Sequence, residues 1–119
     1  MKKIFLIIFL LFPTICFASD WTKADTVREL TFAALVVVDW GQTLNIADHP
    51  TKHKEYNPIL GRHPSRGDVN LYMPLAIIVH GTVSYLLPQK YRKWWQYITI
   101  GTEAVTISHN FSLGIGVTF

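Results

Sequence analysis

Polar side chains recur at helical spacing in three apolar segments of the chain. Asp39, Gln42 and Thr43 fall on one face of the first segment, and His80 and Ser84 are one helical turn apart in the second. The third segment is the richest, and its polar residues, spaced alternately by three and four, are Gln96, Thr99, Glu103, Thr106 and Asn110. A polar stripe on an otherwise apolar helix must face a partner, a cavity or water.

The stretch "EYNPILGRHPS", Glu55 to Ser65, joins the first two segments and is itself polar. Asn57 before Pro58 initiates a turn, and Glu55 is expected to cap a helix N-terminus or to pair with Arg62. If this loop folds back on the helices, it joins the three polar faces in one internal cluster. We expect that cluster to contain Asp39, Gln42, Thr43, Glu55, Asn57, His80, Glu103 and Asn110. An ordinary surface turn is the alternative.

Carboxylates beside imidazoles suggest two kinds of chemistry. His80 and His109 with a carboxylate would suit zinc, yet no H-E-x-x-H motif is present, so both are weak candidates and no cofactor is expected. A carboxylate–His pair could also act in general acid–base catalysis with Ser84 as the nucleophile, but no G-x-S-x-G elbow surrounds that serine. We assign no catalytic residue. The favoured interpretation is a structural network that fixes the register of the helices.

Three helices should position these residues. They are expected at about 22–47, 69–87 and 91–109. Asp25 and Asp68 are the expected N-caps, three prolines prevent a regular helix through the linker, and Pro88 ends the second helix. Residues 110–119 alternate apolar with small or polar side chains, so we expect a short extended C-terminal tail packed along the helices. The predicted fold class is all-α, a three-helix membrane-embedded bundle after an N-terminal signal.

Residues 1–18 have the features of a secretory signal peptide. Two lysines precede an apolar run from Ile4 to Phe12, and Cys16 and Ala18 are the small residues that cleavage after Ala18 requires. An uncleaved first membrane helix is the alternative, but the run is short for a span of about 20 residues. Cleavage would leave residues 19–119 as a single helical domain without cysteine, which excludes disulfides and cysteine-ligated metals.

Charge and composition exclude a nucleic-acid partner and favour a membrane. The net charge of +3 includes the two signal lysines, and nine basic residues then face eight acidic ones, so no basic stripe remains. Only 16% of the residues are charged, against about a quarter in ordinary domains. Aromatic residues next to helix ends, such as Trp21 and those in "YRKWWQY", resemble interface anchors. We expect an exported protein in contact with membrane lipid, in the inner membrane, with the periplasm or the outer-membrane periphery as alternatives.

Five short stretches form a recognisable pattern: "DWGQT", "EYNPILGRHPS", "YLLP", "WQYITIGTEA" and the "HN" before a glycine-rich end. The pattern resembles that of small uncharacterised exported or membrane proteins of Gram-negative bacteria and their prophages. The resemblance covers nearly the whole chain after the signal. It implies a shared fold and shared polar positions at Asp39, Thr43, Glu55, Asn57 and Pro58, and it implies no reaction.

The sequence thus predicts a small exported helical membrane protein with an internal polar cluster. A non-enzymatic role is favoured, in which the protein contacts another envelope protein. The resemblance to prophage proteins implies a phage-type role as one form of that contact. Two alternatives stay open: a metal-binding protein or hydrolase that uses a carboxylate–His cluster, and a soluble periplasmic helical protein that binds a partner through its tail.

Overall fold

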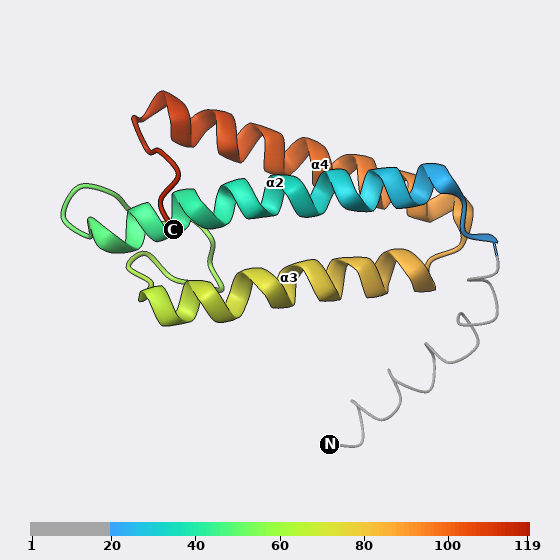
Figure 1. Ribbon diagram of the computed structural model, residues 1–119, viewed down its shortest axis with the longest axis horizontal. Coiled ribbons are helices and arrows are strands. Elements are labelled where there is room, and N and C mark those ends of the chain that lie inside the picture. Colours follow the sequence, from blue (N-terminus) through green and yellow to red (C-terminus); the bar gives the residue numbers. More distant parts are fainter. Residues whose placement is uncertain (1–19) are drawn as a thin grey trace, which may run out of the picture.

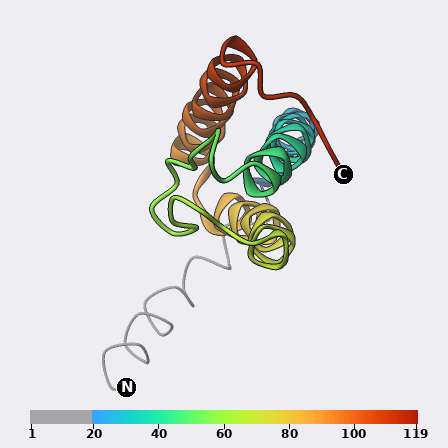
Figure 2. The ribbon, with the colours of Figure 1, turned by 90° about the vertical axis from the view of Figure 1, so that its left-hand side faces the viewer.

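A computed structural model describes residues 20–119, so the expected signal peptide, residues 1–18, lies outside the described residues. The described chain forms three α-helices and no strand (Figure 1). They are α2 (Lys23–Asp48), α3 (Arg66–Leu86) and α4 (Gln89–Ser112). The prediction of an all-α fold of three helices is therefore confirmed. α2 packs against both other helices, whereas α3 and α4 touch each other little (Figure 1 and Figure 2).

Two capping boxes set the first residues of α2 and α3. Thr22 Oγ1 accepts the N–H of Asp25 at 3.2 Å, and the Asp25 carboxylate accepts the N–H of Thr22 at 2.9 Å. Ser65 and Asp68 repeat this reciprocal pair at 3.1 and 3.2 Å. The prediction that Asp25 and Asp68 are N-caps was wrong, because in a capping box the hydroxyl residue is the cap and the acid follows three residues later. α3 consequently begins at Arg66.

The start of α4 depends on one buried arginine. α4 begins directly after Pro88, two residues earlier than predicted, and Pro88 offers no capping side chain, although the Asp20 carboxylate accepts the N–H of Gln89 at 3.2 Å. Arg92 instead donates from Nε to the Ser84 carbonyl at 2.7 Å and from Nη2 to the Leu87 carbonyl at 2.8 Å. These carbonyls lie at the C-terminus of α3, where a positive charge is favourable. The Arg92 guanidinium therefore joins the end of α3 to the start of α4.

α4 continues to Ser112 and then turns sharply at Gly114. Gly114 has a φ of 77°, a conformation that glycine adopts without steric strain. Its N–H donates to the Phe111 carbonyl and that of Ile115 to the Asn110 carbonyl, both at 3.0 Å, which is a Schellman motif. Residues 110–112, predicted to belong to the tail, are helical, because α4 ends only at this motif around Gly114. The remaining tail is extended and lies along α2 (Figure 1).

The tail packs closely on the backbone of α2 at Gly41. The N–H of Thr118 donates to the Gly41 carbonyl at 3.0 Å, and Asn45 Nδ2 donates to the Gly116 carbonyl at 3.0 Å. A Cβ atom added at Gly41 would lie 2.3 Å from Cγ1 of Val117. The absence of a side chain at this position is therefore what allows the tail to approach α2.

We expect Gly41→Ala to displace the tail and to lower the free energy of unfolding by about 1–3 kcal/mol, the usual effect of overpacking. Thermal unfolding followed by circular dichroism, together with carboxypeptidase digestion of the tail, measures both effects. The matched control is Gly101→Ala, where an added Cβ meets nothing within 4 Å. That variant should be as stable as the parent or slightly more so, because alanine is the better helix former. Equal stability of the two variants would contradict the close packing of the tail.

The interior of the bundle is as polar as it is apolar. The apolar core lies mainly between α2 and α3 and contains Phe32, Val36, Leu44, Val69 and Met73. Eight hydrophobic residues are buried in the described chain, and so are eight polar or charged ones. The buried polar residues are Asp25, Gln42, Thr43, His80, Ser84, Arg92, Gln96 and Asn110. Burial of such groups is unfavourable unless they are hydrogen-bonded or paired. The partners of these eight side chains therefore determine whether they stabilise the bundle.

Candidate functional site

The structure divides the predicted polar cluster into separate groups along the bundle. His80 lies near the α3–α4 turn in a network that we call the paired cluster: Asp25, Glu29, His80, Ser84, Arg92 and Gln96. Nearer the linker, three carboxylates line a common cavity, and we call these the acidic pocket: Asp39, Glu55 and Glu103. The two groups differ in that the paired cluster contains its own cations.

Arg92 is the centre of charge compensation in the paired cluster. The side chains of Arg92 and Asp25 are both fully buried, and Arg92 Nη1 donates to Asp25 Oδ2 at 3.0 Å. Arg92 Nη2 also donates to the partly exposed Asp20 at 2.8 Å. Arg28 pairs with the other oxygen of Asp25 and donates from Nε to Gln96 Oε1 at 2.7 Å. Buried charges at this end of the bundle are thus paired and hydrogen-bonded, as burial requires.

Glu29 connects the paired cluster to the histidine. Its carboxylate accepts hydrogen bonds from Ser84 Oγ and from Gln96 Nε2 at 3.1 Å, and it lies 3.0 Å from Nδ1 of His80. His80 Nε2 lies 2.7 Å from the Thr99 hydroxyl. The carboxylate stands between Ser84 and His80, so the imidazole does not contact the serine hydroxyl as the base of a nucleophilic pair would. This geometry favours a structural role for all three residues.

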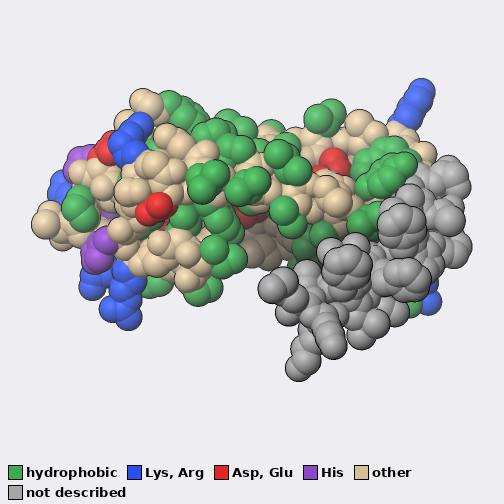
Figure 3. All heavy atoms as spheres, turned by 90° about the horizontal axis from the view of Figure 1, so that it is seen from below, with side chains coloured by type: hydrophobic (Ala, Val, Ile, Leu, Met, Phe, Trp, Pro, Cys, Tyr) green, Lys and Arg blue, Asp and Glu red, His purple; other side chains and the backbone are tan. Residues whose placement is uncertain are grey.

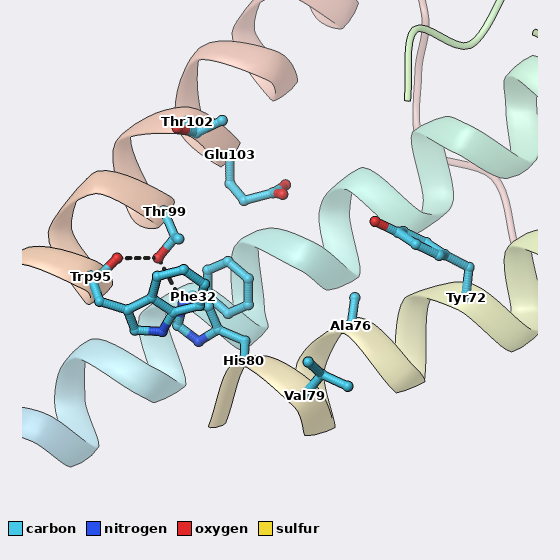
Figure 4. Close-up of a pocket in the computed structure, with 9 residues that line it drawn as sticks. All are labelled: Phe32, Tyr72, Ala76, Val79, His80, Trp95, Thr99, Thr102 and Glu103. Atoms are coloured by element: carbon cyan, nitrogen blue, oxygen red, sulfur yellow. Dashed lines mark hydrogen bonds between the residues drawn. The ribbon is translucent and has the colours of Figure 1, made fainter. Parts of the chain in front are cut away.

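A groove between α3 and α4 begins beside His80, whose ring is stacked between those of Phe32 and Trp95, with centroids 3.6 and 4.8 Å away. The groove has a volume of about 290 Å³, and we call it the α3–α4 groove (Figure 4). Its other lining residues are Tyr72, Ala76, Val79, Thr99, Thr102 and Glu103. In Figure 4 the side chains of Glu103 from α4 and Tyr72 from α3 extend toward each other across the groove.

The acidic pocket holds negative charge without a cation. Its cavity measures about 350 Å³, and its three carboxyl groups are near enough to repel one another. Among residues 20–119, no side-chain nitrogen of Lys, Arg or His lies within 4.0 Å of a carboxylate oxygen of Asp39, Glu55 or Glu103. Oε2 of Glu103 is buried, and no described N–H or O–H group donates to it. A hydrogen bond between the carboxyl groups of Asp39 and Glu103 would need one of them to carry a proton.

The linker folds back on the helices and brings Glu55 to the pocket. The N–H of Asn57 donates to Glu55 Oε1, and the N–H of Ile59 donates to Asn57 Oδ1, both at 2.9 Å. Glu55 therefore caps its own turn instead of a helix, and it meets Arg62 through the backbone, N–H to carbonyl, at 2.9 Å. Asn57 Nδ2 donates to the Tyr72 hydroxyl at 2.9 Å and ties the loop to α3. Burial raises the pKa of the Glu55 carboxyl, and the hydrogen bond from the Asn57 N–H opposes that rise.

Of the remaining predicted residues, Gln42 and Asn110 join α2 to α4, whereas Thr43 does not. Asn110 Nδ2 donates to Gln42 Oε1 at 3.0 Å, and Gln42 Nε2 donates to the Ile107 carbonyl at 3.2 Å. The Thr43 hydroxyl donates to the Asp39 carbonyl at 2.8 Å, within its own helix. These amide contacts hold the two helices in register at the linker end of the bundle.

The predicted metal ligands do not converge. Among the described residues, no group of three or more His, Cys, Asp or Glu side chains is arranged to hold a metal ion. His80 is bound to Glu29 and Thr99, whereas His109 is exposed and lines a different hollow together with Lys54, Glu55 and Asn110. The two histidines therefore contribute to separate parts of the molecule.

Asp25, Glu29 and Arg92 are members of the paired cluster that sequence reasoning did not place there. Asp25 and Glu29 were detectable, because the spacings from Asp25 to Glu29, Phe32 and Val36 are four, three and four, which continues the buried face of α2. Arg92 lies in a basic stretch that was interpreted as an interface anchor. Arg92 is buried because it contacts the start of α2 at Asp25 and the end of α3 at Ser84, and no local sequence pattern reveals such contacts.

Comparisons of the chain with family models, with curated proteins and with solved structures found no match. The function must therefore be inferred from the paired cluster, the acidic pocket and the α3–α4 groove, and from the side chains that the helices expose.

Proposed function

We propose that the chain is a helical protein of the bacterial inner membrane that contacts another envelope protein within the bilayer. One observation carries this proposal: the bundle buries polar side chains and exposes large apolar ones. In water that distribution is unfavourable on both counts. In a bilayer it is favourable, because lipid tails solvate the apolar exterior while polar groups pair with one another inside.

The exterior of the helices is apolar over most of its length. Nineteen large hydrophobic residues are exposed in the described chain. On α3 they include Leu71, Leu75 and Ile78, which share one face, and on α4 they include Ile98 and Val105. Figure 3 shows apolar side chains over the middle of the molecule, with His and most of the visible Lys and Arg at the linker end on the left and further Lys or Arg at the right-hand end. An apolar band that ends in basic residues is typical of proteins that sit in a bilayer.

The helices have the length that a bilayer requires. They contain 21 to 26 residues, which at 1.5 Å per residue gives roughly 31–39 Å, against about 30 Å of hydrocarbon. α2 and α3 are apolar and long enough to cross a membrane. Each of these two helices contains an apolar stretch of 18 residues. Only 39% of that stretch in α2 and 22% of it in α3 is buried in the bundle. A core helix of a soluble protein would be mostly buried, so these fractions favour lipid contact.

Sodium carbonate extraction of isolated membranes tests the proposal directly. We expect the protein to stay in the membrane pellet after extraction and to be released only by detergent. Release of the folded protein into the carbonate supernatant would overturn the proposal and favour a soluble periplasmic bundle.

A charge placed on the outer face of α3 provides a second test of whether that face lies in water or in a bilayer. Ile78 is 62% exposed, so in water Ile78→Arg should change stability by no more than about 0.5 kcal/mol. In a bilayer the same change should cost about 2.5–3.5 kcal/mol on the insertion scale, with a matching fall in the membrane-inserted fraction. Ile59→Arg is the matched control, because Ile59 is 77% exposed but lies in the linker. Equal insertion of both variants would contradict a lipid-facing α3.

A further inference from the structure

The α3–α4 groove is a place where the bundle lacks a neighbour. α3 and α4 meet at their turn but touch little elsewhere. α2 closes one side of the space between them, and the linker crosses the opposite side at the linker end (Figure 2). The groove is lined mainly by apolar and aromatic side chains, with Phe32 of α2 at its base. Glu103 and Thr102 line both this groove and the acidic pocket, so the two hollows adjoin.

The charge of the adjoining pocket defines what the groove would accept. In the described residues, each carboxylate of the paired cluster has a cationic or histidine partner, whereas Asp39, Glu55 and Glu103 have none within 4.0 Å. Lys54, the nearest basic residue along the chain, is exposed and makes no ion pair with Glu55. One proton shared between two of the three carboxyl groups would still leave two negative charges in the pocket. Half-buried carboxylates of this kind are stabilised by a cation from outside the bundle.

The helices of a second copy of this chain would not supply the missing cation. No Lys or Arg occurs in residues 30–48, 67–86 or 94–112, which make up most of the three helices, and Lys52, Lys54 and Arg62 belong to the linker. Arg28 and Arg92 are both bonded to Asp25. A metal ion is disfavoured as well, since the described carboxylates are not arranged to hold one.

We infer that the α3–α4 groove binds a membrane-spanning helix of another envelope protein, and that a Lys or Arg of that helix reaches Glu103 and the adjoining acidic pocket. The apolar lining would pack against the partner helix, while the carboxylates would select its cation. This inference rests on the proposed function, because such a helix can approach the groove only in the bilayer. It assigns the paired cluster to holding the bundle together and the acidic pocket to recognition.

Synthetic helices test the inference without knowledge of the natural partner. The full-length protein, labelled with an energy-transfer donor, is reconstituted in phosphatidylcholine vesicles with acceptor-labelled peptides. One peptide is a leucine–alanine helix with a single central lysine, and the other has leucine in its place. We expect the lysine peptide to bind at least about tenfold more tightly, a difference of about 1.4 kcal/mol. Glu103→Gln should remove that preference, whereas Asp48→Asn, which alters an exposed ion pair with Arg66, should retain it.

The outcomes separate the inference from the proposal on which it rests. Flotation of the vesicles first measures whether the protein is embedded, and failure to float overturns the proposed function itself. If the protein floats, equal affinity for both peptides, or a lysine preference that survives Glu103→Gln, overturns the inference alone. A thermal midpoint raised by millimolar calcium, with no peptide preference, would assign the pocket to a metal ion and would also overturn it.

Discussion

Arg92→Ala is expected to lower the free energy of unfolding by about 3–5 kcal/mol, the usual effect of removing one partner of a buried ion pair. The side chain is fully buried and serves Asp25, Asp20 and the carbonyls of Ser84 and Leu87 together. Its loss leaves Asp25 buried beside Arg28 alone and opens the last turn of α3. Circular dichroism of the purified protein during unfolding in mixed detergent micelles measures the change.

The control for that variant is a second arginine in an exposed ion pair. Arg66 contacts Asp48 at 2.7 Å, but the two side chains are 44% and 33% exposed. Arg66→Ala should therefore cost no more than about 1 kcal/mol. Arg92→Lys adds a further test, because lysine keeps the charge but lacks the planar fork that reaches several acceptors at once. If Arg92→Ala lowered the free energy of unfolding by no more than Arg66→Ala does, the buried guanidinium would not be the link between α3 and α4.

Two glutamates of the interior are expected to respond to the same substitution with opposite signs. Glu103→Gln should raise the free energy of unfolding by about 1–3 kcal/mol, because it removes a half-buried anion whose buried Oε2 has no described donor and whose neighbours are carboxylates. The new amide can also donate to Asp39 or Glu55. Glu29→Gln should instead lose about 2–4 kcal/mol, because charge-assisted hydrogen bonds from Ser84 and Gln96 and the contact with His80 are weakened.

Both glutamine variants can be measured in the same detergent-unfolding assay, so the comparison is internal. Residues that serve binding commonly reduce stability, and a gain at Glu103 is the pattern expected of a recognition residue. A loss of stability in Glu103→Gln equal to that of Glu29→Gln would mean that the acidic pocket is a structural network like the paired cluster.

The helices were predictable because their ends are encoded locally. The Thr22–Asp25 and Ser65–Asp68 pairs, the linker prolines and Pro88 act within a few residues of the helix ends that they set. The errors in the predicted helix ends also concerned only a few neighbouring residues. The acids were taken as caps where the preceding hydroxyls are the caps, and the alternation after Asn110 was extended into the last turn of α4.

The division of the polar residues could not be predicted, because periodicity places a residue on a face without naming its neighbour. Helical spacing put Glu103 and Gln96 correctly on one stripe of α4. It could not indicate that Gln96 meets Asp25 and Glu29, which carry partners, while Glu103 meets Asp39 and the linker, which do not. Which residues become neighbours depends on how α2 and α4 pack against each other and on the path of the loop from Glu55 to Arg62.

The docking of the tail on Gly41 has a consequence for the order of assembly. Residues 113–119 leave the ribosome well after the segment that forms α2. During translation, the surface of α2 around Gly41 and Asn45 therefore stays uncovered until Val117 and Phe119 have emerged. The closing of this side of α2 thus waits for a segment that is synthesised after all three helices.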